Sequence, residues 1–355
     1  MTQPTSATPR TRIAVIFILL LIGLAALVVV RLYTGDLAGA AKFRWPEGII
    51  LETHALLILS AIIAGSALAG GGVALQALLR NPLAEPFILG LSSGAALGIM
   101  VQRYILEMWL SGGRGQADES GVAEAPGALV HWLAGLHYEA ALIGAAATMA
   151  IVYIVGRRHG LIDPLMLLLT GVVISMINGS LIMLLRFLMP LERWQDISFW
   201  MAGQLNEAHT LGPIAAVGVV TAVGVSVLWG YGRAMDAASF SDAEAASLGV
   251  NLARLRVLLF LIAATLAGGA VVLAGPLAFI GLVAPHLARL MLGPSHRNLV
   301  IGAAIIGAAL VVAADLAVRL MSQGRGILPI GIFTVALGGP VFILMLRSRL
   351  SRGAM

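Results

Sequence analysis

The sequence predicts an all-α, polytopic membrane protein with about ten transmembrane helices. Hydrophobic residues make up 59% of the 355-residue chain and charged residues only 11%, whereas soluble domains carry roughly 25% charged residues. The mean hydropathy is +0.97. Apolar runs close to the roughly 20 residues needed to cross a bilayer recur along the chain, without the alternation typical of membrane barrel strands. A single membrane domain over residues 1–355 is therefore expected.

Ten apolar runs, separated by polar, glycine-containing or proline-containing segments, are the candidate helices. They lie at Ile13–Tyr33, Ala55–Leu78, Phe87–Leu106, Ala140–Val155, Leu161–Leu188, Leu211–Trp229, Leu255–Ala274, Phe279–Leu292, Leu299–Leu320 and Ile330–Leu346. The first run could be a secretory signal that ends near Ala38-Gly39-Ala40. Its apolar core exceeds the roughly 7 to 15 residues of such signals, so an uncleaved first helix is favoured.

Basic residues are distributed unevenly between the two sides that ten spans create. If the N-terminus is cytoplasmic, 13 of the 22 Lys and Arg residues lie on the inner side. This excess follows the positive-inside rule and predicts that both termini are cytoplasmic. The polar, glycine-rich segment of residues 111–139 then forms an outer loop, and residues 230–254 form an inner loop.

The inner loop carries signals for two short helices around a glycine. Ser241 is a candidate N-cap, and Asp242 and Glu244 place acidic groups in the first helical turn. Gly249 is a natural stop, and Asn251 would then begin a second short helix. We therefore expect a folded inner loop.

Several functional classes are excluded by missing residues. The chain has no cysteine, so it can form no disulfide, thiolate metal site or cysteine nucleophile. Its one lysine, Lys42, does not follow a glycine-rich phosphate-binding loop. No nucleophile, base and orienting group occur at related spacings. The sequence therefore predicts a non-catalytic chain that binds no metal or cofactor, and ATP, if used, must be bound by another chain.

One long stretch and five shorter ones carry a resemblance to a known family. They are residues 69–98, Ser198–Gly203, Ala245–Val250, Gly275–His286, Leu328–Gly331 and Gly338–Pro340. The long stretch includes Arg80-Asn81-Pro82-Leu83-Ala84-Glu85-Pro86. In this order the stretches resemble the FecCD/BtuC family of type II importer permeases, which move ferric siderophores, haem and cobalamin.

The resemblance implies a BtuC-like fold with ten helices per subunit and a homodimer around a central pathway. It also implies two cytoplasmic subunits that bind ATP and Mg, and a periplasmic substrate-binding protein. The expected function is the permease subunit of an ATP-driven importer in a bacterial inner membrane, moving a metal chelate into the cytoplasm. Haem, ferric siderophore and cobalamin all stay open as substrates, with a slightly closer likeness to the haem branch.

The resemblance also assigns roles to individual residues. Coupling to the ATPases falls on the inner loop, at Ser241, Asp242, Glu244, Ala245, Leu248, Gly249 and Arg254. The arginines that such permeases usually carry at the outer start of the second helix are absent from Leu51–Ala55. Arg319 matches an arginine that the family uses for docking, so the resemblance places the binding protein there, with Lys42, Arg44 or Arg325 as weaker substitutes.

A group of residues near the outer end of the fifth predicted helix is the candidate substrate pathway. Its members are Met183, Met189, Trp200 and Met201. Methionine sulfur can meet haem iron, but methionine is also a common filler of apolar cores. Both interpretations stay open.

An ion-coupled secondary transporter is the alternative function. That class uses unpaired acidic groups within the membrane, and Asp315 is the one candidate. Arg319 lies four residues later on the same helical face, so a neutralising pair is favoured over an ion site. At the inner end of the second predicted helix, Arg80 and Glu85 are expected to pair across a turn that two prolines stiffen.

Overall fold

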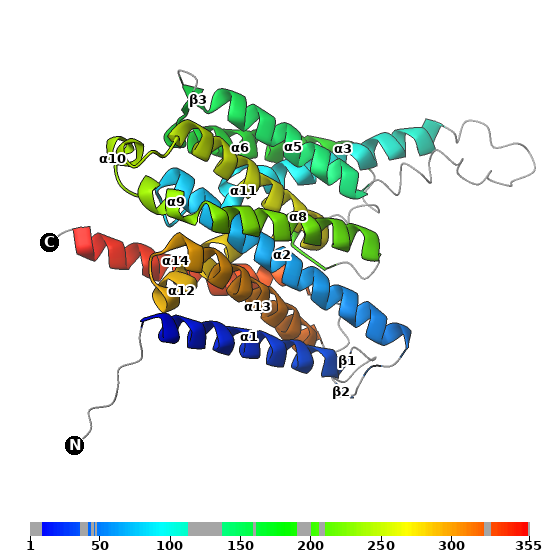
Figure 1. The fold of residues 1–355 in the computed structure, drawn as a ribbon. Coiled ribbons are helices and arrows are strands. Elements are labelled where there is room, and N and C mark those ends of the chain that lie inside the picture. The colour runs from blue at the N-terminus through cyan, green and yellow to red at the C-terminus, as the bar shows by residue number, and fades with distance from the viewer. Residues whose placement is uncertain are drawn as a thin grey trace, which may run out of the picture. The chain divides into compact units, whose positions relative to one another are not determined.

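The computed structural model describes residues 9–35, 42–43, 46, 48–112, 137–158, 161–189, 200–205, 210–322 and 328–353. Within these residues the chain is almost entirely helical (Figure 1), and its ten longest helices follow the ten predicted spans in order. They are α1 (Pro9–Tyr33), α2 (Ile49–Leu79), α3 (Leu91–Gly112), α5 (His137–Val155), α6 (Pro164–Leu188), α8 (Leu211–Gly230), α11 (Leu252–Ala274), α12 (Ile280–Leu292), α13 (His296–Ser322) and α14 (Ile330–Gly353).

Short elements join several of these helices. They are β1 (Thr34–Gly35), β2 (Lys42–Phe43), η1 (Pro86–Leu89), β3 (Arg157–Arg158), β4 (Leu161–Ile162), α9 (Gly232–Ala238) and α10 (Asp242–Ser247). The antiparallel pair of β3 and β4 takes the first residues of the predicted fifth span. Helix α6 therefore begins at Pro164, where the Asp163 side chain accepts hydrogen bonds from the backbone N–H groups of Leu165 and Met166.

The chain forms two compact units. One comprises Met1–Pro86 and Ala202–Met355, and the other comprises Phe87–Met201. In the first unit α2 is a central helix that packs against α8, α11, α12 and α13. In the second unit α3, α5 and α6 pack against one another.

Glycine allows α2 to approach its neighbours closely. A Cβ atom at Gly65 would lie 2.2 Å from the carbonyl oxygen of Gly307 in α13. A Cβ atom at Gly72 would lie 1.9 Å from the carbonyl oxygen of Gly281 in α12. Small residues let helix backbones meet within a membrane, where packing rather than water exclusion holds helices together. The backbone of α2 is therefore in direct contact with two other helices of its unit.

The second unit packs in the same way, through Gly94 and Gly98 of α3. A Cβ atom at Gly98 would lie 2.1 Å from the carbonyl oxygen of Ala140, and one at Gly94 would lie 2.7 Å from that of Gly144. Both acceptors belong to α5. Gly94 and Gly98 therefore let the backbones of α3 and α5 approach closely.

Six of the described helices are long and apolar enough to cross a membrane. They are α1, α2, α6, α8, α11 and α13. Shorter apolar helices lie at Glu139–Val155, Ile280–Leu292 and Ile330–Met345. None of the residues in the most apolar window of α1 is buried inside the protein, so these side chains need an apolar environment outside the chain. The chain is a multi-pass membrane protein.

A buried cluster of charges joins α1 to α13. The predicted pair of Asp315 and Arg319 is confirmed, with 3.4 Å between Oδ1 and Nε. Asp315 also pairs through Oδ2 with Nε of Arg31, whose side chain is fully buried. The sequence analysis missed Arg31, although a lone arginine at the end of an apolar run was a signal that it needs an acidic partner.

Candidate functional site

The segment of residues 230–254, which the sequence predicts to be an inner loop, folds into α9 and α10 before α11 begins. Ser241 caps α10 as predicted, and Gly249 ends the segment with a φ of +80°. Asn251 does not begin a separate short helix, because the apolar run that follows continues as α11. Its Oδ1 atom accepts a hydrogen bond of 3.0 Å from the backbone N–H of Arg254. The prediction of a short helix after Gly249 is therefore wrong, and the second short helix, α9, precedes Ser241.

Helix α10 is held at its start by a reciprocal pair of hydrogen bonds. The backbone N–H of Glu244 donates to Oγ of Ser241 at 3.2 Å, and the backbone N–H of Ser241 donates to Oε2 of Glu244 at 2.9 Å. The bonds from the Ser241 backbone and side chain hold the pKa of Glu244 below its usual value. This capping box stabilises a helix of only six residues, which would not persist by propensity alone.

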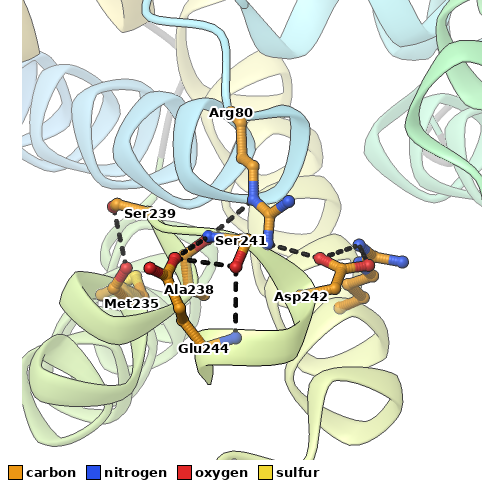
Figure 2. Close-up of polar contacts among 8 residues, drawn as sticks. Arg80, Met235, Ala238, Ser239, Ser241, Asp242 and Glu244 are labelled. Atoms are coloured by element: carbon orange, nitrogen blue, oxygen red, sulfur yellow. Dashed lines mark hydrogen bonds and ion pairs between the residues drawn. The ribbon is translucent and has the colours of Figure 1, made fainter. Parts of the chain in front are cut away.

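Arg80, at the end of α2, binds both α9 and α10 (Figure 2). Its Nε donates to the carbonyl oxygen of Ala238 at 2.7 Å, and its Nη2 donates to Oδ1 of Asp242 at 2.5 Å. Nη2 of Arg256 in α11 donates to both carboxylate oxygens of Asp242, at 3.1 and 3.0 Å. Asp242 thus links α10 to two long helices. We call Arg80, Ala238, Asp242 and Arg256 the Arg80 cluster.

The charges of the Arg80 cluster change the acidity of its carboxylate. Burial acts to raise the pKa of Asp242, but the hydrogen bonds and charges of Arg80 and Arg256 outweigh it. The pKa of Asp242 therefore lies below its usual value, and the carboxylate is ionised near neutral pH. The sequence analysis named Asp242 but not Arg80 or Arg256 as coupling residues. Its expectation that Arg80 pairs with Glu85 is wrong, since Glu85 instead accepts a hydrogen bond from the backbone N–H of Phe279.

Of the rest of the predicted coupling set, Ala245, Leu248 and Gly249 lie on the same short segment, whereas Arg254 lies in α11. Ala245 is fully buried and anchors α10, whereas Gly249 and Arg254 are exposed. Leu248 is 66% exposed, and Phe240, which the sequence analysis did not name, is 63% exposed. The segment from Phe240 to Gly249 therefore presents two large apolar side chains, one before and one after the capped helix α10. We call it the α10 segment.

Of the residues proposed for binding-protein docking, Arg319 lies among those that the structure describes. Arg319 lies in the buried charge cluster, with a side chain that is 6% exposed. Arg44 and Arg325 lie outside the described residues. Arg319 is paired with Asp315, and because its side chain is buried, little of it can contact another protein. Docking by these residues stays a prediction.

Three of the four proposed pathway residues lie together in the second unit. Met189, Trp200 and Met201 pack against a buried cluster that includes Met100. Met183, by contrast, is 70% exposed on α6. Among the described residues, no three His, Cys, Asp or Glu side chains are grouped as metal ligands. A role for these four residues in transport stays a prediction.

Comparison with known proteins places this architecture in a transport family. The model of the FecCD transport family matches residues 11–348. The hemin transport system permease protein HmuU of Yersinia pestis is 34% identical over 300 residues, which cover 83% of this chain and 82% of that protein. The vitamin B12 import system permease protein BtuC of Vibrio cholerae is 31% identical over 335 residues, which cover 92% of each.

Further likenesses agree with these two. A probable siderophore transport system permease protein of Bacillus subtilis, YfiZ, is 32% identical over 84% of this chain and 82% of its own length. The inward-facing structure of a metal-chelate type ABC transporter has the same fold, with a TM-score of 0.76 at 24% identity over 96% of this chain and 99% of that one. The predicted family resemblance is confirmed. Because the family model matches nearly the whole chain, the protein belongs to the FecCD transport family.

Proposed function

We propose that this chain is the membrane-spanning permease subunit of an ATP-driven importer that moves a metal chelate from the periplasm to the cytoplasm. The family match over residues 11–348 carries the proposal. Relatives with about one third identity are named as permeases for hemin, siderophore and vitamin B12. Haem, ferric siderophore and cobalamin are accordingly the substrates to test.

The partners follow from what the chain lacks and what it exposes. Its single lysine, Lys42, does not end a phosphate-binding loop, so separate cytoplasmic subunits bind ATP and Mg. The α10 segment, with Leu248 and Phe240 exposed, is the surface on which such a subunit acts. The assembly contains two of these subunits, one for each chain of the homodimer. A homodimer in the bacterial inner membrane and a periplasmic binding protein complete the proposed assembly. Both chain termini lie in the cytoplasm.

The buried charge cluster argues against the alternative of an ion-coupled secondary transporter. Such a transporter needs an acidic group that can exchange its ion or proton. Asp315 is held by Arg31 and Arg319, and its side chain is 4% exposed. Both carboxylate oxygens of Asp315 are engaged by guanidinium groups, Oδ2 by Arg31 and Oδ1 by Arg319. Asp315 is better suited to joining helices than to carrying a coupling ion.

Transport by the assembled complex in liposomes tests the proposal. ATP-dependent accumulation of haem, ferric siderophore or cobalamin is expected only when the ATPase subunits are present and active. A complex with an inactive nucleotide site is the control, and an uncoupler should have no effect. Accumulation that proceeds without the ATPases, or that an uncoupler abolishes, would contradict the proposal and favour the secondary transporter.

A further inference from the structure

We propose that Arg80 is a positioning residue that transmits movement of the α10 segment to α2, and through α2 to α12 and α13. The inference rests on the proposed function, since it concerns how the ATPases drive this chain. It adds Arg80 to the residues that couple the ATPases to transport, whereas the sequence predicted that Arg80 would pair with Glu85. Four observations carry it.

The first observation is the backbone of Arg80 itself. Arg80 follows the last residue of α2 and adopts the left-handed conformation, with φ 49° and ψ 31°. Glycine is the usual residue there, because a Cβ atom is disfavoured in that region. Only one other non-glycine residue among those described, Phe279, has a positive φ. A large side chain in this conformation is held by its surroundings, which points to a role for the side chain.

The second observation is that the guanidinium group spans two elements at once. Nε binds the carbonyl oxygen of Ala238 at the end of α9, and Nη2 binds Asp242 at the start of α10 (Figure 2). The planar guanidinium fixes the direction of both bonds, which a single ammonium group cannot do. The turn between α9 and α10 is therefore tied to the end of α2 at two points.

The third observation is the firm packing of α2. Near Arg80, Nε2 of Gln76 donates to the carbonyl oxygen of Gly281 in α12 at 3.4 Å. One turn earlier, Gly72 meets the backbone of Gly281, and further along Gly65 meets that of Gly307 in α13. A displacement of the inner end of α2 must therefore move α12 and α13 with it, because these backbones have no space in which to slide independently.

The fourth observation is that the structure separates transmission from local folding. Asp242 also accepts two bonds from Arg256, a second partner separate from Arg80. The capping box of Ser241 and Glu244 does not involve Arg80. The α10 segment should thus stay folded and able to meet an ATPase after loss of Arg80, while its link to α2 is gone.

The test compares Arg80→Gln, Arg80→Lys and wild type in the full complex, reconstituted in liposomes. The probe is whichever of haem, ferric siderophore and cyanocobalamin the wild-type complex accumulates. The readouts are complex assembly by size-exclusion chromatography, ATP hydrolysis, and ligand imported per ATP hydrolysed. The matched control is Arg233→Gln, which removes an exposed arginine of α9 outside the Arg80 cluster.

The Arg80→Gln complex should assemble and hydrolyse ATP within about twofold of wild type, while import per ATP falls at least fivefold. Arg80→Lys should be intermediate, and Arg233→Gln should match wild type. Import per ATP that is the same in Arg80→Gln and Arg233→Gln would overturn the inference. Failure of both Arg80 variants to assemble would also overturn it, by assigning Arg80 to the docking surface. If wild type shows no ATP-dependent import, the proposed function fails instead.

Discussion

Arg31 of α1 and Asp315 of α13 form a buried ion pair between residues that are 284 positions apart in the sequence. Helix α1 carries an apolar window with no buried residue, so side-chain burial contributes little to fixing its place. The ion pair supplies a directional contact where apolar packing is sparse. Arg319, the second partner of Asp315, lies on the same helix and completes the buried charge cluster.

Asp315→Asn should destabilise the protein strongly. The substitution leaves the guanidinium groups of Arg31 and Arg319 buried without their carboxylate, and breaking a buried pair in this way costs about 3 to 5 kcal/mol. Thermal unfolding in detergent, followed by the loss of monodisperse protein, measures the effect. Glu52→Gln, at an exposed position in the first turn of α2, is the control and should change little. Equal stability of the two variants would show that the pair is unimportant.

Leu248→Ser should weaken assembly with the ATPase subunits without affecting the fold. Leu248 is 66% exposed, so its loss removes little buried contact from the isolated chain. A buried apolar anchor at an interface is worth about 1 to 2 kcal/mol, or roughly tenfold in affinity. Affinity of detergent-solubilised permease for its ATPase is the measurement. Ile49→Ser, at a 78% exposed position at the opposite end of α2 from Arg80, should bind as wild type does.

Ser241→Ala should loosen α10. The change removes the oxygen that accepts from the Glu244 backbone, and losing such an N-cap costs about 1 kcal/mol. Amide hydrogen exchange over Asp242–Ser247 should become about fivefold faster. Exchange in α11, which has its own cap at Asn251, should not change. Unaltered exchange in α10 would mean that packing of Ala245, rather than the cap, holds the helix.

Glu85 should make stability depend on pH. It lies in the turn after α2, outside the spanning helices, and burial raises its pKa from 4.5 to about 7 against the opposing bond from Phe279. Because the pKa of Glu85 is higher in the folded state, protonated Glu85 contributes stability that is fully present below pH 4.5. That stability is lost as the pH rises through 7. The loss corresponds to roughly 3 kcal/mol.

Melting temperatures from pH 5 to 8.5 test this dependence. Wild type should become less stable as the pH rises, and Glu85→Gln should remove most of that slope, because the amide oxygen still accepts from Phe279 but carries no charge. Asp163→Asn, a change at an exposed helix cap, should keep the wild-type slope. Parallel slopes in wild type and Glu85→Gln would exclude Glu85 as the source.

Gly72→Ala should destabilise the contact of α2 with α12. The added Cβ would lie 1.9 Å from the carbonyl oxygen of Gly281, and forcing an extra methyl group into a packed core typically costs about 1 to 3 kcal/mol. Gly23→Ala in α1 is a matched control, because no atom lies within 4 Å of the Cβ position there. Thermal unfolding in detergent compares the two. Equal effects would show that α2 and α12 can separate at little cost.

Much of this fold could be predicted because its signals are local. An apolar run of suitable length predicts a membrane helix whatever its tertiary contacts are. All ten predicted spans therefore correspond to helices in order. The cap at Ser241 was also readable, since it depends on Glu244 only three residues later. The start of α6 was misplaced by three residues, because the strand pair β3–β4 gives no clear signal in an apolar run.

Which charged side chains pair with each other was harder to predict from the sequence, and the reason is geometric. Asp315 with Arg319 follows from helical spacing, whereas nothing near Asp315 in the sequence indicates Arg31. In the same way Glu85, five residues from Arg80, is the partner that sequence proximity suggests. The structure instead places Asp242, 162 residues away, against Arg80.

The sequence by itself determined the ten long helices of the described residues, the membrane environment, the family and the capped segment at Ser241, since each depends on composition or on neighbours within a few residues. Only the tertiary structure decided which distant charges meet, that Arg80 ties α10 to α2, and that Arg319 is buried with Asp315. An ion pair requires two side chains within a few ångströms of each other. Which distant side chains satisfy that condition depends on how the helices pack, and no local pattern encodes it.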